Sequence, residues 1–476
     1  MTLVYQHIFY IYSNAIVVYL KINMQFSFDS TLQYTEDQII EYLKSCRPEE
    51  EIFKCTDNHG NTLLHTYAGR KYEKLQDYIL SEYPDIIYAE NDMFESPLIS
   101  AVDFRNVSLV KKILDIDPGL LYLGDENGDC AFQREVHFSY GSDEILREMW
   151  AYYDDEKVNY DKLLLGAMAN SAVKTKFILE NIPEGYNYVD PNGNNILHLA
   201  CKIYSHNISI LKDILENSEG LTEHTNDEGK IPLHYAAYSP RKFTQVYNCF
   251  PNGIYIQDNE GNTPLHIFVQ SQYDTTEILQ DIIRSHPEAM SIQNLGGDTV
   301  VMVMSRNYEV PYMSYMYTMF AANPDSFIVN NNNNNNILHE ICFYKSYNWY
   351  KVVDFIIEKY LYLLFEKNND GFIPLDYGIM GVGEKSYKVD QENFLSVCLK
   401  YTPLDDTYWK VFYGTCPKIV NVFGIILKRS EKEASKAFKL MPYSAQSKVY
   451  TILMSLRKYN LEKEHIYDIV FHALKK

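Results

Sequence analysis

Apolar and polar positions follow a pattern that recurs every 31 to 37 residues along most of the chain. Each period has a polar turn, a short apolar segment that often contains a Leu-His pair, and a longer amphipathic segment. The clearest short segments are NTLLHTYA from Asn61, NNILHLAC from Asn194, KIPLHYAA from Lys230, NTPLHIFV from Asn262 and NNILHEIC from Asn335. The aligned turn positions are Gly60, Phe94, Gly128, Asn159, Gly193, Gly229, Gly261, Gly297, Asn334 and Gly371. A period of this length predicts stacked units that share one continuous core.

Each period contains the signals for two helices. Before the turn position stands a polar residue whose side chain can bond the turn backbone, as at Asp57, Asp190, Asn226, Asp258 and Asn368. Proline or a capping threonine then opens the first helix. The amphipathic segments, such as KLQDYIL and ISILKDIL, predict the second helix. We expect a proline to end this second helix at Pro84, Pro118, Pro251, Pro287 and Pro324.

These residues resemble the ankyrin repeat family, whose unit is a turn, a TPLHxAA helix opening, a second apolar helix and a connecting loop. Only Thr263-Pro264-Leu265-His266 matches the TPLH part of this opening in full, and Asp376 replaces the histidine of the last clear copy. The resemblance implies an all-α solenoid of paired antiparallel helices with β-turn fingers and helical caps at both ends. It covers residues 53–383 as about ten repeats, of which those at Phe94, Gly128, Asn159 and Gly297 are degenerate.

The two ends differ from the array. Residues 1–28 form an apolar segment whose first 22 residues are nearly long enough to span a bilayer. A membrane anchor, a packed helix and a gene-model extension before Met24 all fit this segment. Residues 29–52 are expected to hold a capping helix from Asp29 to Cys46, with Ser30 or Thr31 as its cap and Ile39, Ile40 and Leu43 facing inward. Residues 384–476 are expected to be a helical cap or small domain.

The net charge bears on the class of partner, and the cysteine content bears on the cellular location. The formal net charge of -20 argues against nucleic-acid binding, which depends on Lys and Arg. A protein partner with a basic segment fits this charge better. The chain turns basic from Gly424 onward, where eleven Lys or Arg face five Asp or Glu. Eight scattered cysteines without CxxC pairs favour a reducing, cytoplasmic location.

The repeated histidines are interpreted as structural. His65, His198, His234, His266 and His339 occur once per repeat, and packed helices lie about 8–10 Å apart. Zinc requires nitrogen ligands at about 2.0–2.1 Å, so neighbouring histidines cannot share an ion without distortion. By resemblance to the family, each histidine ties its helix opening to neighbouring turn backbone. We expect no metal, no cofactor and no catalytic residue.

The run from Asn330 to Asn336 falls on the turn before ILHEIC. Asparagine is tolerated in turns because its side chain bonds locally and accepts left-handed backbone angles. The sequence favours a neutral length expansion of an exposed turn.

The turn tips carry the candidate binding residues. The tip positions are Asp92, Glu95, Glu126, Asp129, Asp227, Glu228, Glu260, Asp298 and Asp370. We call these nine the acidic tip residues. In ankyrin-like repeats the tips and the exposed side of the first helix form the recognition face, so the acidic tip residues are expected to steer a basic partner segment. A solvated charged edge that keeps the array soluble is the alternative.

The most favoured function is a non-enzymatic scaffold for protein binding. A second interpretation is a substrate adaptor of a ubiquitin ligase, because LMPYSAQSKVYTIL from Leu440 weakly resembles an F-box-like opening. A third is a membrane-tethered ankyrin protein, which depends on residues 1–22. A fourth is an enzyme with a C-terminal site in which Cys416 and His465 or His472 serve as nucleophile and base, but the sequence does not orient these groups.

Overall fold

The computed structural model describes residues 35–45, 56–57, 59–137, 143–154, 160–203, 208–217, 219–271, 276–306, 312–345, 349–379, 393–394, 397–401 and 438. The chain divides into two compact units. Unit 1 comprises residues 1–189 and 202–218, and unit 2 comprises residues 190–201 and 219–476. The described residues form α-helices, short 3-10 helices and turns, with an isolated β-bridge between Gln293 and Thr299, and the all-α class expected from the sequence is confirmed.

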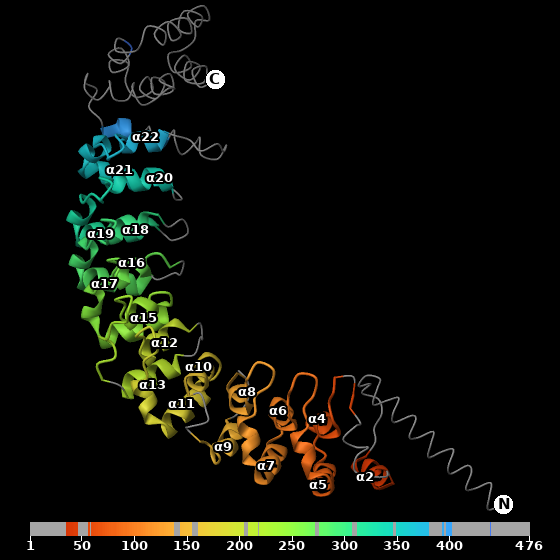
Figure 1. Ribbon diagram of the computed structural model, residues 1–476. Helices are drawn as coiled ribbons and strands as arrows, with labels where there is room; N and C mark the ends of the chain where they lie inside the picture. The colour runs from red at the N-terminus through yellow and green to blue at the C-terminus, as the bar shows by residue number, and fades with distance from the viewer. Residues whose placement is uncertain are drawn as a thin grey trace, which may run out of the picture. The chain divides into compact units, whose positions relative to one another are not determined.

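Unit 1 is a stack of helix pairs (Figure 1). Its α-helices are α2 (Glu36–Ser45), α4 (Leu63–Tyr67), α5 (Glu73–Glu82), α6 (Pro97–Asp103), α7 (Val107–Ile116), α8 (Ala131–His137), α9 (Glu144–Trp150), α10 (Tyr160–Asn170), α11 (Ala172–Asn181) and α13 (Ser209–Asn217). Three 3-10 helices follow second helices: η1 (Pro84–Tyr88), η2 (Pro118–Tyr122) and η3 (Pro183–Asn187). The first helices α4, α6, α8 and α10 pack successively on one another.

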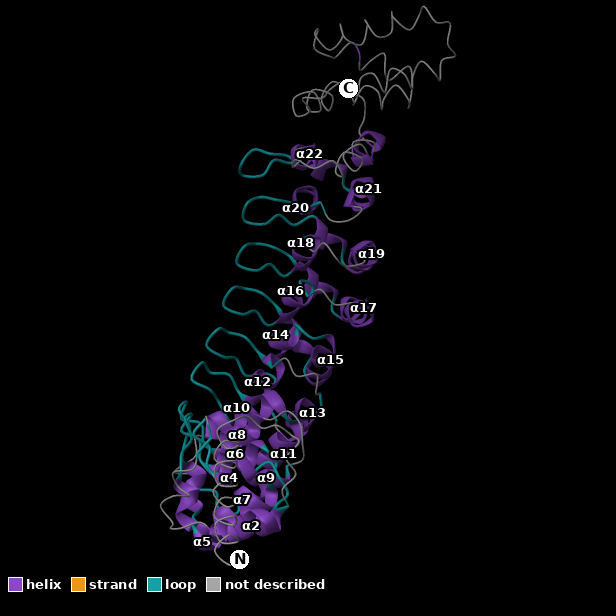
Figure 2. Cartoon of the chain, turned by 90° about the vertical axis from the view of Figure 1, so that its right-hand side faces the viewer, coloured by secondary structure: helices purple, strands orange, loops and turns teal. Residues whose placement is uncertain are grey.

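Unit 2 repeats the same arrangement. Its α-helices are α12 (Ile196–Lys202), α14 (Pro232–Ala236), α15 (Pro240–Cys249), α16 (Pro264–Phe268), α17 (Thr276–Ser285), α18 (Val300–Ser305), α19 (Tyr312–Ala322), α20 (Ile337–Tyr344), α21 (Trp349–Lys359) and α22 (Pro374–Ile379). Its 3-10 helices are η4 (Pro251–Tyr255), η5 (Pro287–Ser291), η6 (Pro324–Phe327) and η7 (Leu361–Phe365). Figure 2 shows the loops of unit 2 projecting beyond the first helices α14, α16, α18, α20 and α22, with the second helices on the opposite side.

The predicted turn positions are confirmed wherever the structure describes them. Gly60, Phe94, Gly128, Gly193, Gly229, Gly261, Gly297, Asn334 and Gly371 all have positive φ angles, between 58° and 83°. Asn159 lies outside the described residues. Two of these positions are not glycine: Phe94 and Asn334 both have φ 58°. The repeats that are degenerate in sequence at Phe94, Gly128 and Gly297 therefore keep the same turn.

The expected role of proline after the second helix is also confirmed. Pro84, Pro118, Pro251, Pro287 and Pro324 each begin a 3-10 helix directly after a second helix. Proline cannot donate the backbone bond that would continue the α-helix, so the chain leaves the helix at this point. The 3-10 turn then leads into the next finger.

The Leu-His segments supply the core. The leucine of each pair, at Leu64, Leu197, Leu233, Leu265 and Leu338, is at most 1% exposed. Full burial of one leucine contributes about 1.5–3 kcal/mol, so the repeated leucine is a main source of stacking energy. Small residues such as Ala68 and Ala236 are also buried and let neighbouring first helices approach.

The N-terminal capping helix is shorter at its start than expected. Helix α2 begins at Glu36 and is capped by Thr35, whose Oγ1 accepts a bond from Gln38 N, while Thr35 N donates to Gln38 Oε1. This reciprocal capping box fixes the helix start and replaces the predicted Ser30 or Thr31 cap. Leu43 is buried, but Ile39 and Ile40 are only half-buried. Helix α2 packs on α5.

Several expectations lie outside the described residues. These are the apolar segment 1–28, the LMPYSAQSKVYTIL segment, the helices expected after 401, and Cys416, His465 and His472. Among the residues that are described, none of the helices has both the length and the apolar character needed to cross a bilayer.

Candidate partner-binding surface

Every described finger is built on the same side-chain-to-backbone bonds. At the finger of the Gly261 repeat, Asp258 Oδ1 accepts from the backbone amides of Glu260 (3.0 Å) and Asn262 (2.8 Å). The equivalent residues make the same two bonds: Asp57, Asn91, Asp125, Asp190, Asn226, Asn294, Asn331 and Asn368. The sequence pattern predicted this acceptor in five repeats, and the structure adds Asn91, Asp125, Asn294 and Asn331.

Backbone hydrogen bonds link each finger to its neighbour. In unit 2, Asn259 N donates to Glu228 O at 2.9 Å and Leu295 N donates to Glu260 O at 3.0 Å. In unit 1, Asp92 N donates to His59 O and Glu126 N donates to Met93 O. These bonds fix the spacing of successive fingers. Side chains at the tips are therefore presented by an ordered backbone.

The repeated histidines connect adjacent repeats. The Nδ1 atom of each accepts from the backbone amide that precedes its helix, as in Thr263 N to His266 Nδ1 at 3.1 Å. The Nε2 atom donates to a carbonyl in the next finger, as in His266 Nε2 to Asp298 O at 3.1 Å. The same pair of bonds is made by His65, His198, His234 and His339. Both ring nitrogens are therefore engaged in holding the fold.

Burial keeps these imidazoles neutral. It lowers the pKa of all five histidines, to about 4 for His198 and His339. A neutral ring can accept at Nδ1 and donate at Nε2, which is the pattern observed. Among the described residues there is no group of three or more His, Cys, Asp or Glu side chains placed to hold a metal ion.

The acidic tip residues fall into two groups. Asp92, Glu126, Asp227, Glu228, Glu260 and Asp370 are exposed. Glu95, Asp129 and Asp298 instead turn inward, where they form ion pairs with Arg134, Lys162 and Arg306 respectively. These three do not lie at the tips as expected, because the residue after the turn position points toward the next repeat. They leave two exposed acidic tip residues in unit 1 and four in unit 2.

The asparagine run is a regular finger, contrary to the expected neutral expansion. We call the side-chain acceptor three positions before each turn position the Asx residue. From its Asx residue, Asn331, to the helix cap Asn336, the run has the same length as Asp258 to Thr263 in a clear repeat. Asn334 takes the left-handed turn position. Asn336 caps α20, since its Oδ1 accepts from the amides of Leu338 and His339. Each of these asparagines therefore has the bonding role of its position in the finger.

Four positions come together where the Phe94 and Gly128 repeats stack and where the Gly297 and Asn334 repeats stack, and we call this set a repeat junction. Two of the positions are the first and ninth residues after one turn position. The other two belong to the next repeat: its Asx residue, which precedes the next turn position, and the sixth residue after that turn position. In unit 2, the junction between the Gly297 and Asn334 repeats holds Asp298, Arg306, Asn331 and Glu340. We call these four residues the Arg306 cluster.

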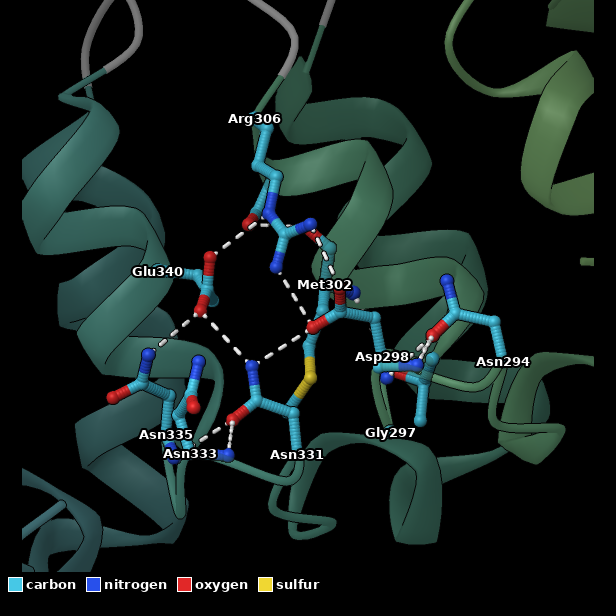
Figure 3. Close-up of polar contacts among 12 residues, drawn as sticks. Asn294, Gly297, Asp298, Met302, Arg306, Asn331, Asn333, Asn335 and Glu340 are labelled. Carbon is cyan, nitrogen blue, oxygen red and sulfur yellow. Dashed lines mark hydrogen bonds and ion pairs between the residues drawn. The ribbon is translucent and has the colours of Figure 1, made fainter. Parts of the chain in front are cut away.

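Figure 3 shows the Arg306 cluster as a closed network. Arg306 bonds Asp298 through both terminal nitrogens, at 2.7 and 2.8 Å, and bonds Glu340 Oε2 through Nε at 2.9 Å. Asn331 Nδ2 donates to Asp298 at 2.8 Å and to Glu340 at 3.3 Å. Burial alone lowers the pKa of Arg306, but bonds to the two carboxylates outweigh burial and raise it. The arginine is thus fully ionised and held in one orientation.

In unit 1, the junction between the Phe94 and Gly128 repeats holds Glu95, Asp103, Asp125 and Arg134, which we call the Arg134 cluster. Arg134 forms ion pairs with all three carboxylates. Its Nε lies 3.5 Å from Asp103 Oδ1, and neither atom has a hydrogen-bond partner. Burial raises the pKa of Asp103 to about 6, against the lowering effect of Arg134 and with added repulsion from Glu95 and Asp125.

Large exposed apolar side chains accompany the acidic tips, and the sequence pattern did not single them out. On the fingers these are Met93, Phe94, Leu295 and Phe372, and at the ends of first helices they are Phe104, Tyr238 and Phe343. Tyr238 and Phe343 occupy the same ninth position after the turn as Arg306. Comparing this position from repeat to repeat is the signal that could have found them.

Beside the Arg306 cluster lies a cavity of about 330 Å³. Its lining includes Arg306, Glu340 and the asparagine finger as well as the aromatic residues Phe343, Tyr344 and Tyr377. It therefore combines charged groups with aromatic rings on the finger side of α20 and α22.

Comparison with known proteins identifies no relative by sequence. No family model matches the sequence, and a search of curated proteins finds no match. Solved structures that match include the ankyrin repeat domain of Bcl-3, described as a unique member of the IkappaB protein family. That match covers 52% of this chain and 95% of that chain, at 17% identity and a TM-score of 0.28.

The fold is decided by the chain's own geometry instead. Left-handed turns, Leu-His helix openings, histidine bonds to the next finger and antiparallel second helices recur together through the described residues. The described residues have the ankyrin-repeat fold. The ankyrin fingers and first helices carry the exposed acidic and apolar residues described above.

Proposed function

We propose that this ankyrin array is a non-enzymatic scaffold that binds a protein partner through its fingers and the exposed ends of its first helices. The observation that carries the proposal is the presence of Phe94, a bulky apolar residue, at an exposed left-handed turn position. Seven of the eight other described turn positions hold glycine and one holds asparagine.

Phe94 is unfavourable for the isolated protein in two ways. A left-handed backbone costs a residue with a Cβ atom roughly 1–2 kcal/mol relative to its preferred conformations. The ring is also 56% exposed, beside the exposed Met93. Strained positions of this kind concentrate at functional sites. An aromatic anchor that is buried by a partner accounts for both features, because aromatic residues supply much of the energy of protein interfaces.

Exchange of Phe94 for glycine tests the proposal directly. Full-length wild-type and Phe94→Gly proteins are used as bait, and the captured proteins are identified and quantified. We expect the variant to be more stable to urea by about 0.5–1 kcal/mol, since glycine removes the strain at some entropic cost. We expect it to capture less of the principal partner.

Asn334→Gly is the matched control, because it changes the same turn position with the same φ angle. Asparagine tolerates this conformation, so neither stability nor capture should change much. Equal capture by wild-type protein and Phe94→Gly would contradict the assignment of Phe94. Failure of the wild-type chain to retain any specific partner would contradict the function itself.

The exposed acidic tip residues support a partner with a basic segment. Asp227, Glu228 and Glu260 lie on two successive fingers joined by the Asn259 N to Glu228 O bond. Opposite charges on two proteins accelerate their association, and salt screens this effect. We propose that these acids steer the basic segment toward the finger face.

Charge reversal of Asp227, Glu228 and Glu260 to lysine should slow association and flatten its salt dependence, as measured by stopped-flow or surface binding kinetics. The control reverses Glu277, Asp281 and Glu288, which are exposed on or after the second helix α17. Both triple variants change the net charge equally. If they slow association equally, total charge rather than the finger face accounts for steering.

A further inference from the structure

The cavity beside the Arg306 cluster has two chemically distinct walls. One wall is charged and consists of Arg306 with Glu340 and the buried Asp298. The other is aromatic and consists of Phe343 and Tyr344 from α20 and Tyr377 from α22. At about 330 Å³ the cavity has room for one large side chain.

The aromatic wall is held in place by edge-to-face contacts. The rings of Phe343 and Tyr377 are 5.6 Å apart at 81°, and those of Phe343 and Tyr344 are 5.1 Å apart at 76°. Tyr377 is further fixed by Asn368, whose Nδ2 donates to its hydroxyl at 3.1 Å. Phe343 is 60% exposed in spite of these contacts. Its ring is therefore ordered and open to a ligand.

The charged wall is net negative. Asp298 and Glu340 contribute two negative charges and Arg306 one positive charge, which leaves one negative charge in excess. The guanidinium also lies over the ring of Tyr344, 5.7 Å from its centroid. Arg306 is thus already matched by carboxylates and an aromatic face. Negative charge next to aromatic rings favours a cationic ligand, because the faces of such rings also attract positive charge.

We infer that this cavity receives one arginine or lysine side chain of the bound partner. The inference rests on the proposed function and adds the chemistry of one contact to it. The aliphatic part of the side chain packs on Phe343 and Tyr377, and the charged end lies toward the Asp298 and Glu340 carboxylates. The chain's net charge of -20 favours the same class of partner.

Four pools of synthetic peptides test the inference. The pools share a randomised neutral background and differ in the central residue, which is arginine, lysine, norleucine or glutamate. Binding to the full-length chain is measured by fluorescence polarisation at about 0.15 M salt, where weak contacts between exposed charges are largely screened. We expect the arginine and lysine pools to bind about threefold more tightly than the norleucine pool.

The decisive variant is Phe343→Leu, which removes the ring without changing charge. It should reduce binding of the arginine and lysine pools to the norleucine level. Tyr238→Leu is the matched control, because Tyr238 is an exposed aromatic residue at the same ninth position of another repeat. This control should leave binding unchanged. Thermal unfolding of both variants checks that they are folded.

Four results would overturn the inference. Equal binding of the arginine pool by wild-type protein and Phe343→Leu means that the cavity is not its site. Tightest binding of the norleucine pool makes the cavity a plain apolar pocket, and tightest binding of the glutamate pool makes Arg306 an anion site. Absence of binding by every pool also rejects it. In each case, partner capture that still depends on Phe94 would leave the proposed function standing.

Discussion

The Arg306 cluster of unit 2 and the Arg134 cluster of unit 1 occupy the same four positions of a repeat junction. In the Arg306 cluster, arginine is the ninth residue of the first repeat and the acid Glu340 is the sixth residue of the next. In the Arg134 cluster these two charges are exchanged, with Asp103 at the ninth position and Arg134 at the sixth. Charge can therefore be swapped across the junction without changing the fold around it.

The two clusters differ in how completely their charges are matched. Arg306 faces two carboxylates and has ordinary hydrogen-bond distances to both. Arg134 faces three carboxylates, and the pKa of Asp103, raised by burial to about 6, shows that one of them is poorly compensated. The Asx residue accounts for the third charge, because it is Asp125 in one cluster and Asn331 in the other. One amide in place of one acid thus leaves one excess negative charge in the Arg306 cluster, against two in the Arg134 cluster.

Removal of Arg306 should have the largest effect. Arg306→Met leaves Asp298 and Glu340 buried next to each other without a positive partner. Loss of one partner from a buried ion pair typically destabilises by 3–5 kcal/mol, and the partial exposure of Arg306 reduces this to about 2–4 kcal/mol. Urea unfolding measures the loss, and hydrogen exchange should place it at α18 and α20.

Arg284→Met is the control for this prediction. Arg284 pairs with Asp281 at 3.6 Å, but both side chains are about two-thirds exposed or more. Exposed pairs contribute little, so the change in unfolding free energy should stay within about 0.5 kcal/mol. Similar effects of the two substitutions would show that the Arg306 cluster is only a surface network.

Neutralisation of Asp103 should have a smaller effect of opposite sign. The pKa of Asp103 is about 6 in the folded protein, against an ordinary value of 3.8 for an aspartate carboxyl. The folded state therefore binds more protons than the unfolded state between these values, and ionised Asp103 lowers stability as pH rises from about 4 to above 6. Asp103→Asn removes this loss and should stabilise unit 1 on the order of 1 kcal/mol at pH 7.

The measurement is urea unfolding of wild-type protein and Asp103→Asn at several pH values. The difference between them should shrink as pH falls toward 4, where wild-type Asp103 is protonated. The buried histidines act in the other direction, because their lowered pKa values make the fold lose stability as pH falls below about 6.5. Their contribution is common to both proteins and cancels in the difference. A stabilisation that does not depend on pH would contradict the role of the raised pKa.

Much of this fold could be predicted from the sequence because its signals are local. The turn position, the Asx acceptor three residues earlier and the proline after the second helix act within one repeat. The described turn positions and these prolines were correctly placed from residue type and spacing alone, and the acceptor was correctly placed in five of the nine described fingers. Even the Phe94 repeat, which is degenerate in sequence, keeps its finger because Asn91 supplies the acceptor bonds that matter.

The candidate surface could be predicted only in part because its residues are assigned by contacts between repeats. Asp298 resembles an exposed tip residue in sequence, yet it turns inward because Arg306 and Asn331 surround it. The asparagine run looks like low complexity, yet Asn331 and Asn336 bond to different partners. Such roles can be assigned only when it is known that the first and ninth residues of one repeat contact the sixth residue of the next.

The smallest predicted effect tests whether one amide explains the difference between the clusters. Asp125→Asn gives the Arg134 cluster the Asx residue of the Arg306 cluster. Asparagine keeps the Oδ1 acceptor for the amides of Asn127 and Asp129, as Asn331 does in its own finger, so stability at pH 7 should change by no more than about 0.5 kcal/mol. Removal of one negative charge should lower the pKa of Asp103 toward 3.8, since Asp125 is one of the groups that raise it. The side-chain carboxyl carbon of Asp103, followed by NMR in selectively labelled protein, reports that pKa directly.

Asp129→Asn is the control, because it removes an acid of the same finger that pairs with Lys162 instead of Arg134. If both substitutions shift the Asp103 titration equally, the excess charge belongs to the whole finger and not to the junction.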